Sequence, residues 1–336
     1  MERPGWEKPL RVRLVPNPPT RPEFLAHPRL RRTSPVTHHV VATALEATTA
    51  LRTHSDSKRR LGLVVCLQSG CVNYSCRFYE ETLKDPATAS PLLFPETVYA
   101  APASHAAAVL ESVSLASTLV GDPAVFLQGV SLAAQWLEEN RVDACLVIGA
   151  EETNWILADA LWHLERSSVL TAGAGALCLS RDPKLSVGAE LAAITDAHTY
   201  STRNHRSQAA RAMRRQLGKQ GAPASCRPVT SGPTEKIAGK TPALPELLCD
   251  GIGSDQHTDT PELAAWEDWT GARVSPKRIL GEGLMAAAAW QCVVACDMVA
   301  RGRFAAANVS LVGSNQQAIG ARFVRADSNI SHLSIG

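Results

Sequence analysis

The sequence predicts an α/β protein, and two observations carry that prediction. Short apolar runs with β-branched residues alternate with longer segments of helical period, which is typical of strands joined by crossover helices in a covered sheet. The chain has 336 residues, enough to bury one large core or two similar halves.

Eight strands are expected, each a short apolar run bounded by polar or glycine-containing residues. They are predicted at residues 61–67, 124–128, 143–150, 175–180, 188–197, 246–252, 308–314 and 319–326.

Two segments show the longest helical patterns, residues 151–166 and 284–301. The second is apolar nearly all round, so it is expected in the middle of the molecule. Residues 202–245 are rich in Gly, Pro and Ser and are predicted to be a loop. We expect two halves, residues 1–184 and 185–336.

Composition argues against several kinds of partner. The net charge of +2 gives no overall attraction to nucleic acid or membrane. The N-terminus lacks a signal-peptide pattern, and no apolar run is long enough to span a membrane, so a cytoplasmic location is expected. The nine cysteines are mostly within apolar runs, which suits reduced thiols. Cys66, Cys71 and Cys76 lack zinc-site spacing, so no metal or other cofactor is expected.

Several motifs follow one another between residues 59 and 180: RRLGLVVCLQSG, RFYEETL, SPLLFPETVYAAPASHAAAVL, VGDPAVFLQGVSLAAQWLEENRVDACLVIGAEE and TAGAGALCLS. In order and spacing they resemble the first half of β-ketoacyl synthases. Later, DGIGSDQHTDTPELAAW and SPKRILGEGLMAAAAW resemble the two segments that carry the family's catalytic histidines. The resemblance covers residues 60–325 and implies a thiolase-like, pseudo-twofold fold with α/β/α/β/α layers.

The family's chemistry needs a thiolate at a helix N-terminus, because the helix dipole lowers the thiol pKa, and two imidazoles that stabilise an enolate. The resemblance places the nucleophile where the predicted strand 124–128 would turn into a helix. The residues there include Gln128, Gly129 and Ser131, with no cysteine.

The other catalytic positions are also changed. Gly251 and Glu282 match the two family histidines, whereas Lys277 matches the lysine that precedes the second histidine. A carboxylate at Glu282 would repel an enolate. Residues 313–320 replace the family's glycine-rich loop. The resemblance therefore implies a chain that does not condense acyl groups by itself.

Such a chain is similar to the chain length factor of type II polyketide synthases, which pairs with an active ketosynthase. Many of these factors carry a glutamine in place of the cysteine, and Gln128 is the candidate here. The resemblance implies a heterodimer whose interface bounds an acyl tunnel. The expected tunnel or interface residues are Tyr99, Leu110, Ala124, Phe126, Leu127 and Gln128. An exposed apolar edge strand would make the isolated chain behave poorly.

Two alternatives remain at this stage. One is a homodimeric pseudo-ketosynthase that binds or transfers acyl groups. The other is a serine acyltransferase or hydrolase, since residues 129–133 imitate a nucleophile elbow around Ser131. The histidines available as its base are His198, His205 and His257. Ala133 replaces the elbow's second glycine, which favours Ser131 as a helix N-cap.

Two other patterns have a structural and a functional interpretation. Glu282 and Asp255 could form an acid–base pair, but a helix-capping role is favoured. One segment is locally basic. The favoured interpretation is a helix face exposed to solvent, and the functional alternative is a docking site for an acidic acyl carrier protein. The segment contains Arg203, Arg206, Arg211, Arg214, Arg215 and Lys219.

Overall fold

Two groups of strands form the centre of the computed structural model, which describes residues 1–2, 4–7, 9–53, 59–182, 185, 188–220, 244–253, 256–314, 316–326 and 334–335. The first group has the order β3-β2-β4-β6 and the second the order β10-β9-β11-β12-β7. The bounds are β2 Leu61–Leu67, β3 Val113–Val120, β4 Ala144–Glu151, β6 Gly173–Ser180, β7 Ala189–Ile194, β9 Glu246–Cys249, β10 Ala272–Val274, β11 Ala306–Val312 and β12 Gln317–Arg325.

The two groups repeat one pairing pattern. β2 lies parallel to β3 and β4, and β4 is antiparallel to β6. In the second group, β9 lies parallel to β10 and β11, and β11 is antiparallel to β12. The short strand β13 (Ser334–Ile335) pairs with both β6 and β7 and so joins the groups. This repetition supports our proposal of two related halves that meet near residue 184.

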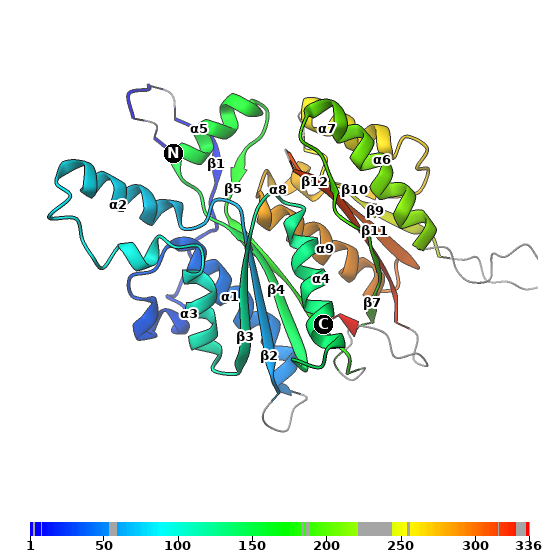
Figure 1. Cartoon of the computed structure of the whole chain (residues 1–336), viewed down its shortest axis with the longest axis horizontal. Helices are drawn as coiled ribbons and strands as arrows, with labels where there is room; N and C mark the ends of the chain where they lie inside the picture. The colour runs from blue at the N-terminus through cyan, green and yellow to red at the C-terminus, as the bar shows by residue number, and fades with distance from the viewer. Residues whose placement is uncertain are drawn as a thin grey trace, which may run out of the picture.

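Helices form three layers around these strands (Figure 1). The outer layer of the first half contains α1 (Pro35–Thr53) and α3 (Ala101–Leu110), and that of the second half contains α6 (Arg203–Gln220) and α7 (Gln256–Ala265). Between the two groups of strands lie α4 (Val125–Glu138) and α9 (Met285–Ala300). The expected α/β/α/β/α layering is confirmed.

Alternating side chains of each central strand explain the layers, because successive residues of a strand point to opposite faces. On β2, Val64 and Cys66 belong to the central core with α4 and α9, whereas Leu63 and Val65 belong to the core beneath α1 and α3. All seven residues of β2 are buried, as expected for a parallel strand covered on both faces.

The remaining elements lie at the ends of the strands. They are β1 (Val12–Arg13), α2 (Val72–Lys84), α5 (Trp155–Leu164), β5 (Leu170–Thr171), β8 (His198–Thr199) and α8 (Pro276–Leu280), with short 3-10 turns at Glu23–Ala26, Pro28–Leu30 and Phe94–Glu96. β1 and β5 form a separate parallel pair. No helix within the described ranges is long and apolar enough to cross a membrane.

Most predicted elements are confirmed, with two corrections. The strand predicted over 124–128 is wrong, because these residues begin helix α4, and the true strand is β3 at 113–120. The loop predicted over 202–245 is wrong for residues 203–220, which form α6; residues 221–243 lie outside the described residues. The apolar helix α9 is buried along most of its length, as its sequence predicts.

A pair of buried glutamates at the end of β4 organises the first half. Glu152 accepts hydrogen bonds from Ser34 Oγ at 2.5 Å, Val36 N at 2.9 Å and Asn73 N at 2.7 Å. Val36 lies in the first turn of α1 and Asn73 in the first turn of α2, so one carboxylate caps two helices. Glu151 accepts from Gln68 N at 2.6 Å, and burial raises its pKa to about 7.

We therefore predict that Glu152→Ala destabilises the chain by about 2–4 kcal/mol, because three buried donors lose their acceptor. Urea unfolding followed by circular dichroism measures this change. Glu138→Ala, at an exposed position of α4, is the matched control and should change the stability by less than about 0.5 kcal/mol. Equal effects of the two variants would contradict this role of Glu152.

Candidate functional site

The turn between β3 and α4 is the place where the family's nucleophile would belong. Since β3 ends at Val120 and α4 begins at Val125, this turn consists of residues 121–124. It contains no cysteine. Gln128 lies within α4, is exposed, and donates from Nε2 to Gln317 Oε1 at 3.0 Å. The turn therefore lies several residues before the position expected from sequence, and a thiol is still lacking there.

A buried carboxylate occupies this turn. Asp122 is 3% exposed; its Oδ1 accepts from Ala124 N at 3.2 Å, and its Oδ2 from Gln316 N at 3.2 Å and Gln317 N at 3.4 Å. Burial raises the pKa of Asp122, and these backbone donors oppose that shift. Asp122 thus ties the start of α4 to the loop between β11 and β12.

The same loop fits closely against the turn. The backbone N–H of Asp122 donates to Gln316 Oε1 at 3.3 Å. A Cβ atom at Gly313 would lie 1.7 Å from Asp122 Oδ2, so only glycine fits there. This loop corresponds to the one that, by resemblance, replaces the family's glycine-rich loop.

Glu282, which by resemblance matches the second family histidine, takes part in an ion pair. Lys277 Nζ, from α8, lies 2.7 Å from Glu282 Oε2, and the two side chains are 15% and 10% exposed. Burial lowers the pKa of Lys277, but the adjacent Glu282 carboxylate outweighs this effect, and the pKa is raised overall. Glu282 Oε1 also accepts from Leu284 N at 2.8 Å, just before α9 begins at Met285. No side-chain hydrogen bond caps α9 itself, so the capping interpretation of Glu282 stays a prediction. Asp255, its suggested acid–base partner, lies outside the described residues.

Gly251, which by resemblance matches the first family histidine, lies beside a buried acid, Glu262. Gly251 N donates to both carboxylate oxygens of Glu262 at 3.2 Å. Burial and the neighbouring Asp250 raise the pKa of Glu262, which is 3% exposed, to about 8. A Cβ at Gly251 would already lie 3.2 Å from Glu262 and 3.4 Å from Gln291. An imidazole would therefore displace these side chains.

The structure connects some of these residues. Glu262 and Glu282 both act electrostatically on Lys277, so Gly251, Glu262, Lys277 and Glu282 form one network. The start of α4 approaches α9 where both pack on β4: a Cβ at Gly149 would lie 3.0 Å from Phe126 and 2.7 Å from Met285 O.

The predicted tunnel and interface residues divide into two groups. Leu110, Ala124, Phe126 and Leu127 are at most 4% exposed and belong to the cores. Tyr99 is 40% exposed and donates from its hydroxyl to Gln68 O at 3.4 Å. Only Tyr99 and Gln128 of the six are therefore accessible on the surface of the single chain.

Ser131 is not placed for catalysis. It lies in the interior of α4, exposed, rather than at a strand-to-helix turn. The nucleophile-elbow interpretation and the N-cap interpretation are therefore both wrong. Of its suggested bases, His198 Nε2 lies 2.8 Å from Gln216 Oε1 and His205 is exposed on α6, whereas the placement of the His257 side chain is not described.

The basic segment forms α6, and its cations differ in environment. Arg206 is 5% exposed and donates to Val312 O at 3.3 Å. Arg214 donates to Ala265 O at 2.6 Å, pairs with Asp268 and lies 4.7 Å from the centre of the Trp266 ring. Arg211, Arg215 and Lys219 are exposed, and the Arg203 side chain is not described.

The described cysteines are not activated as nucleophiles. Burial raises the pKa of every described cysteine thiol: Cys66, Cys71, Cys76, Cys145, Cys178, Cys249, Cys292 and Cys296. Each is therefore a poor nucleophile at neutral pH. The described part of the chain also contains no group of three His, Cys, Asp or Glu residues that could hold a metal ion. The arrangement provides carboxylates, one lysine and backbone donors.

Sequence reasoning missed Asp122, the residue that fills the nucleophile turn. A signal was present, since Asp-Pro before an apolar periodic segment is typical of a helix start. The true boundary of β3 was needed to connect that signal with the family's nucleophile.

Comparison with solved structures relates this architecture to known proteins. A β-ketoacyl synthase from Burkholderia phymatum STM815 aligns with a TM-score of 0.73 and 15% identity, over 96% of this chain and 90% of that one. The ishigamide ketosynthase/chain length factor aligns with a TM-score of 0.67 and 14% identity, over 88% and 83%. AntDE:AntF, a type II polyketide synthase carrier protein in complex with its ketosynthase bound to the hexaketide, aligns with a TM-score of 0.70 and 11% identity, over 96% and 91%.

The chain thus has the thiolase-like fold of ketosynthases, and the resemblance is confirmed at the level of fold. No protein-family model matches the sequence. No curated protein matches it significantly either.

The protonated state of Glu262 leads to a pH prediction. Between pH 4.5 and about 8 the folded chain keeps a proton on Glu262 that the unfolded chain has released, so the free energy of unfolding should fall as the pH rises through this range. Glu262→Gln keeps an acceptor for Gly251 N and should weaken this fall. At pH 8 the variant should be more stable than the wild type by about 1–3 kcal/mol.

Urea unfolding at several pH values measures both slopes. Glu267→Gln, at an exposed position beside α7, is the matched control and should keep the wild-type slope. A Glu262→Gln variant with an unchanged slope would show that Glu262 is ionised in the folded chain.

Proposed function

We propose that this chain is the non-catalytic partner of an active ketosynthase in polyketide or fatty-acid-like chain elongation, a role like that of a chain length factor. The observation that carries this proposal is a ketosynthase fold in which the nucleophile turn contains Asp122 and the imidazole positions contain Gly251 and Glu282. A carboxylate opposes the enolate that decarboxylation forms, so these changes act against the chemistry itself. The proposed setting is the cytoplasm, with no cofactor.

The surface of the first half supports a protein partner. Among the described strands, β3 pairs only with β2, so its other edge has backbone groups available for another chain. Val120, at its end, is 51% exposed. Figure 1 shows β3 at the margin of the first half, beside α3.

Large apolar side chains lie exposed in the neighbouring connection between α2 and α3 and on α2 itself. They are Tyr79, Leu83, Leu92, Phe94, Val98 and Tyr99, each at least 40% exposed. We call these six residues the apolar surface. Exposed large apolar side chains favour a protein interface where they lie close together, and contacts between α2 and the 3-10 turn Phe94–Glu96 bring part of this set together.

The structural neighbours add support of the same kind. One neighbour is a ketosynthase/chain length factor, and another is a ketosynthase in complex with its carrier protein. Both descriptions concern those proteins, and they make a ketosynthase the first partner to test here.

The principal test is co-expression with an active ketosynthase that has an intact catalytic cysteine and two histidines. We expect the two chains to purify together in equal amounts and to elongate malonyl units, whereas this chain alone should form no acyl-enzyme with an acyl thioester. Intact-mass spectrometry measures the acylation. Acylation and elongation by this chain alone would overturn the proposal.

Substitutions in the apolar surface test the interface. Leu92→Asp and Phe94→Asp should lower the affinity for the partner at least tenfold, because each places a charge in a buried contact. Leu263→Asp on α7, in the other half, is the matched control, since Leu263 is 40% exposed. A pull-down with tagged ketosynthase measures how much of each variant stays bound to it. If the two substitutions dissociate a homodimer of this chain and leave its binding to the ketosynthase unchanged, the homodimeric alternative is correct.

We also propose that the exposed cations of α6 contact an acidic carrier protein. Arg211, Arg215 and Lys219 are accessible for this role, whereas Arg206 and Arg214 have internal partners. Arg211→Glu with Arg215→Glu should slow product formation in the assembled enzyme about threefold to tenfold and reduce its salt dependence. Unchanged product titre and salt dependence would leave α6 as a solvated helix face.

A further inference from the structure

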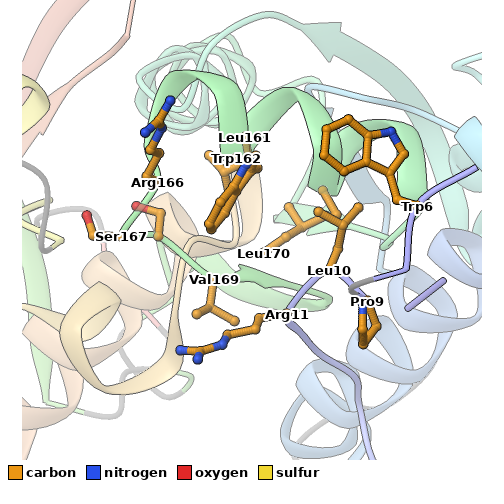
Figure 2. A pocket seen from close by; sticks show the side chains of 12 residues that line it. Trp6, Pro9, Leu10, Arg11, Leu161, Trp162, Arg166, Ser167, Val169 and Leu170 are labelled. Carbon is orange, nitrogen blue, oxygen red and sulfur yellow. The ribbon is translucent and has the colours of Figure 1, made fainter. Parts of the chain in front are cut away.

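A pocket of about 660 Å³ lies outside the residues considered so far. Its walls come from Trp6 and residues 9–11 near the N-terminus, from α5 and from residues 166–170 (Figure 2). The parallel pairing of Val12 with Leu170 and Arg13 with Thr171 holds the N-terminal segment in place.

The walls are mostly apolar. Figure 2 shows Trp6 and Trp162 on either side of the pocket, with Leu10 and Leu170 between them. Trp6 and Trp162 are 62% and 45% exposed. Exposed indole rings that face a concave, apolar space offer large areas for a ligand to cover, at little cost in side-chain entropy.

The charges around the pocket have one sign. The described lining residues include Arg11 and Arg166 and no carboxylate. In Figure 2 both guanidinium groups lie away from Trp6, that of Arg166 above Ser167 and that of Arg11 below Val169. Guanidinium groups bind carboxylates and phosphates through paired hydrogen bonds. The pocket is therefore apolar at one side and anion-binding at the other.

We infer that this pocket binds a small amphipathic anion, an acyl chain that ends in a carboxylate or carries a phosphate. Its volume is within the roughly 300–1,000 Å³ of ligand sites in proteins. The apolar chain would lie between Trp6 and Trp162, and the anionic group would lie on the side of the pocket that carries Arg11 and Arg166. Two sources provide this chemistry, a free fatty acid and an acyl group carried on phosphopantetheine.

The pocket adjoins the altered catalytic positions without including them. Glu282 N donates to Val169 O at 2.9 Å, and Thr171 N donates to Glu282 O at 2.9 Å. The strand-like segment 169–171 thus has the pocket on one side and the segment of Glu282 on the other. The inference concerns a separate site and holds whether or not a ketosynthase partner is found.

Isothermal titration calorimetry on the full-length chain, in the complex in which it purifies, tests this inference with three probes. Decanoate and decyl phosphate should bind saturably, and decanol, which has the chain without the charge, at least about tenfold more weakly. Equal affinity for decanol, or no saturable binding of either anion, would overturn the inference.

Two variants with matched controls assign the binding to this pocket. Trp162→Ala should weaken both anions about tenfold, whereas Ile156→Ala, an exposed change on the same helix, should not. Arg166→Gln should weaken both anions about threefold to tenfold and leave decanol unchanged, whereas Arg181→Gln, an exposed change just after β6, should change none of the three. Unchanged anion binding in both Trp162→Ala and Arg166→Gln would place the probes elsewhere and contradict the inference.

A competition arm distinguishes the two sources. If S-decanoyl-phosphopantetheine displaces decanoate and binds more tightly, the pocket takes carrier-derived acyl groups. If decanoate binds and the thioester does not displace it, the ligand is the free acid. Either result supports the shared chemistry of an apolar chain with an anionic group.

Discussion

A carboxylate removed from water must be held by a cation or by several hydrogen-bond donors, and this constraint organises both halves of the chain. At the end of β4, Glu152 is fully buried and accepts hydrogen bonds from backbone N–H groups in the first turns of α1 and α2. Before α4, Asp122 accepts from its own turn and from the loop that follows β11. In the second half Glu282 has both Lys277 and a backbone donor. Each of these acids joins segments that are distant in sequence.

The same constraint explains how the catalytic positions can change without loss of the fold. By the resemblance, Lys277 matches the family lysine and Glu282 matches a family imidazole. The two side chains form an ion pair, so this carboxylate is satisfied within the protein. Gly251 leaves space that Glu262 and Gln291 occupy closely. Asp122 is held by backbone donors that would otherwise lack an acceptor. The altered site is thus a set of stable internal contacts, which supports a structural role for this region.

Most strands could be predicted because burial on both faces requires continuous β-branched and apolar runs, as in β2 and β4. β3 was missed because an edge strand needs no such run, and its sequence VSLASTLV mixes small polar and apolar residues. Residues 124–128 were wrongly predicted as a strand, because the buried start of a helix between two layers of strands is as apolar as a strand. Since the nucleophile position was inferred from that strand, its error moved the expected site to Gln128.

The parts of the site that depend on short spacing were predictable, and the parts that depend on packing were not. Lys277 and Glu282 are five residues apart, so their positions followed from motif alignment alone. The link between Asp122 and the loop at Gln316 spans 194 residues and exists only because β3 and β11 end near each other in the folded chain. The pocket beside α5 likewise requires Trp6 and residues 9–11 to reach residue 170. Local sequence therefore predicts which positions are altered, whereas tertiary packing determines which side chains meet there and where the pocket forms.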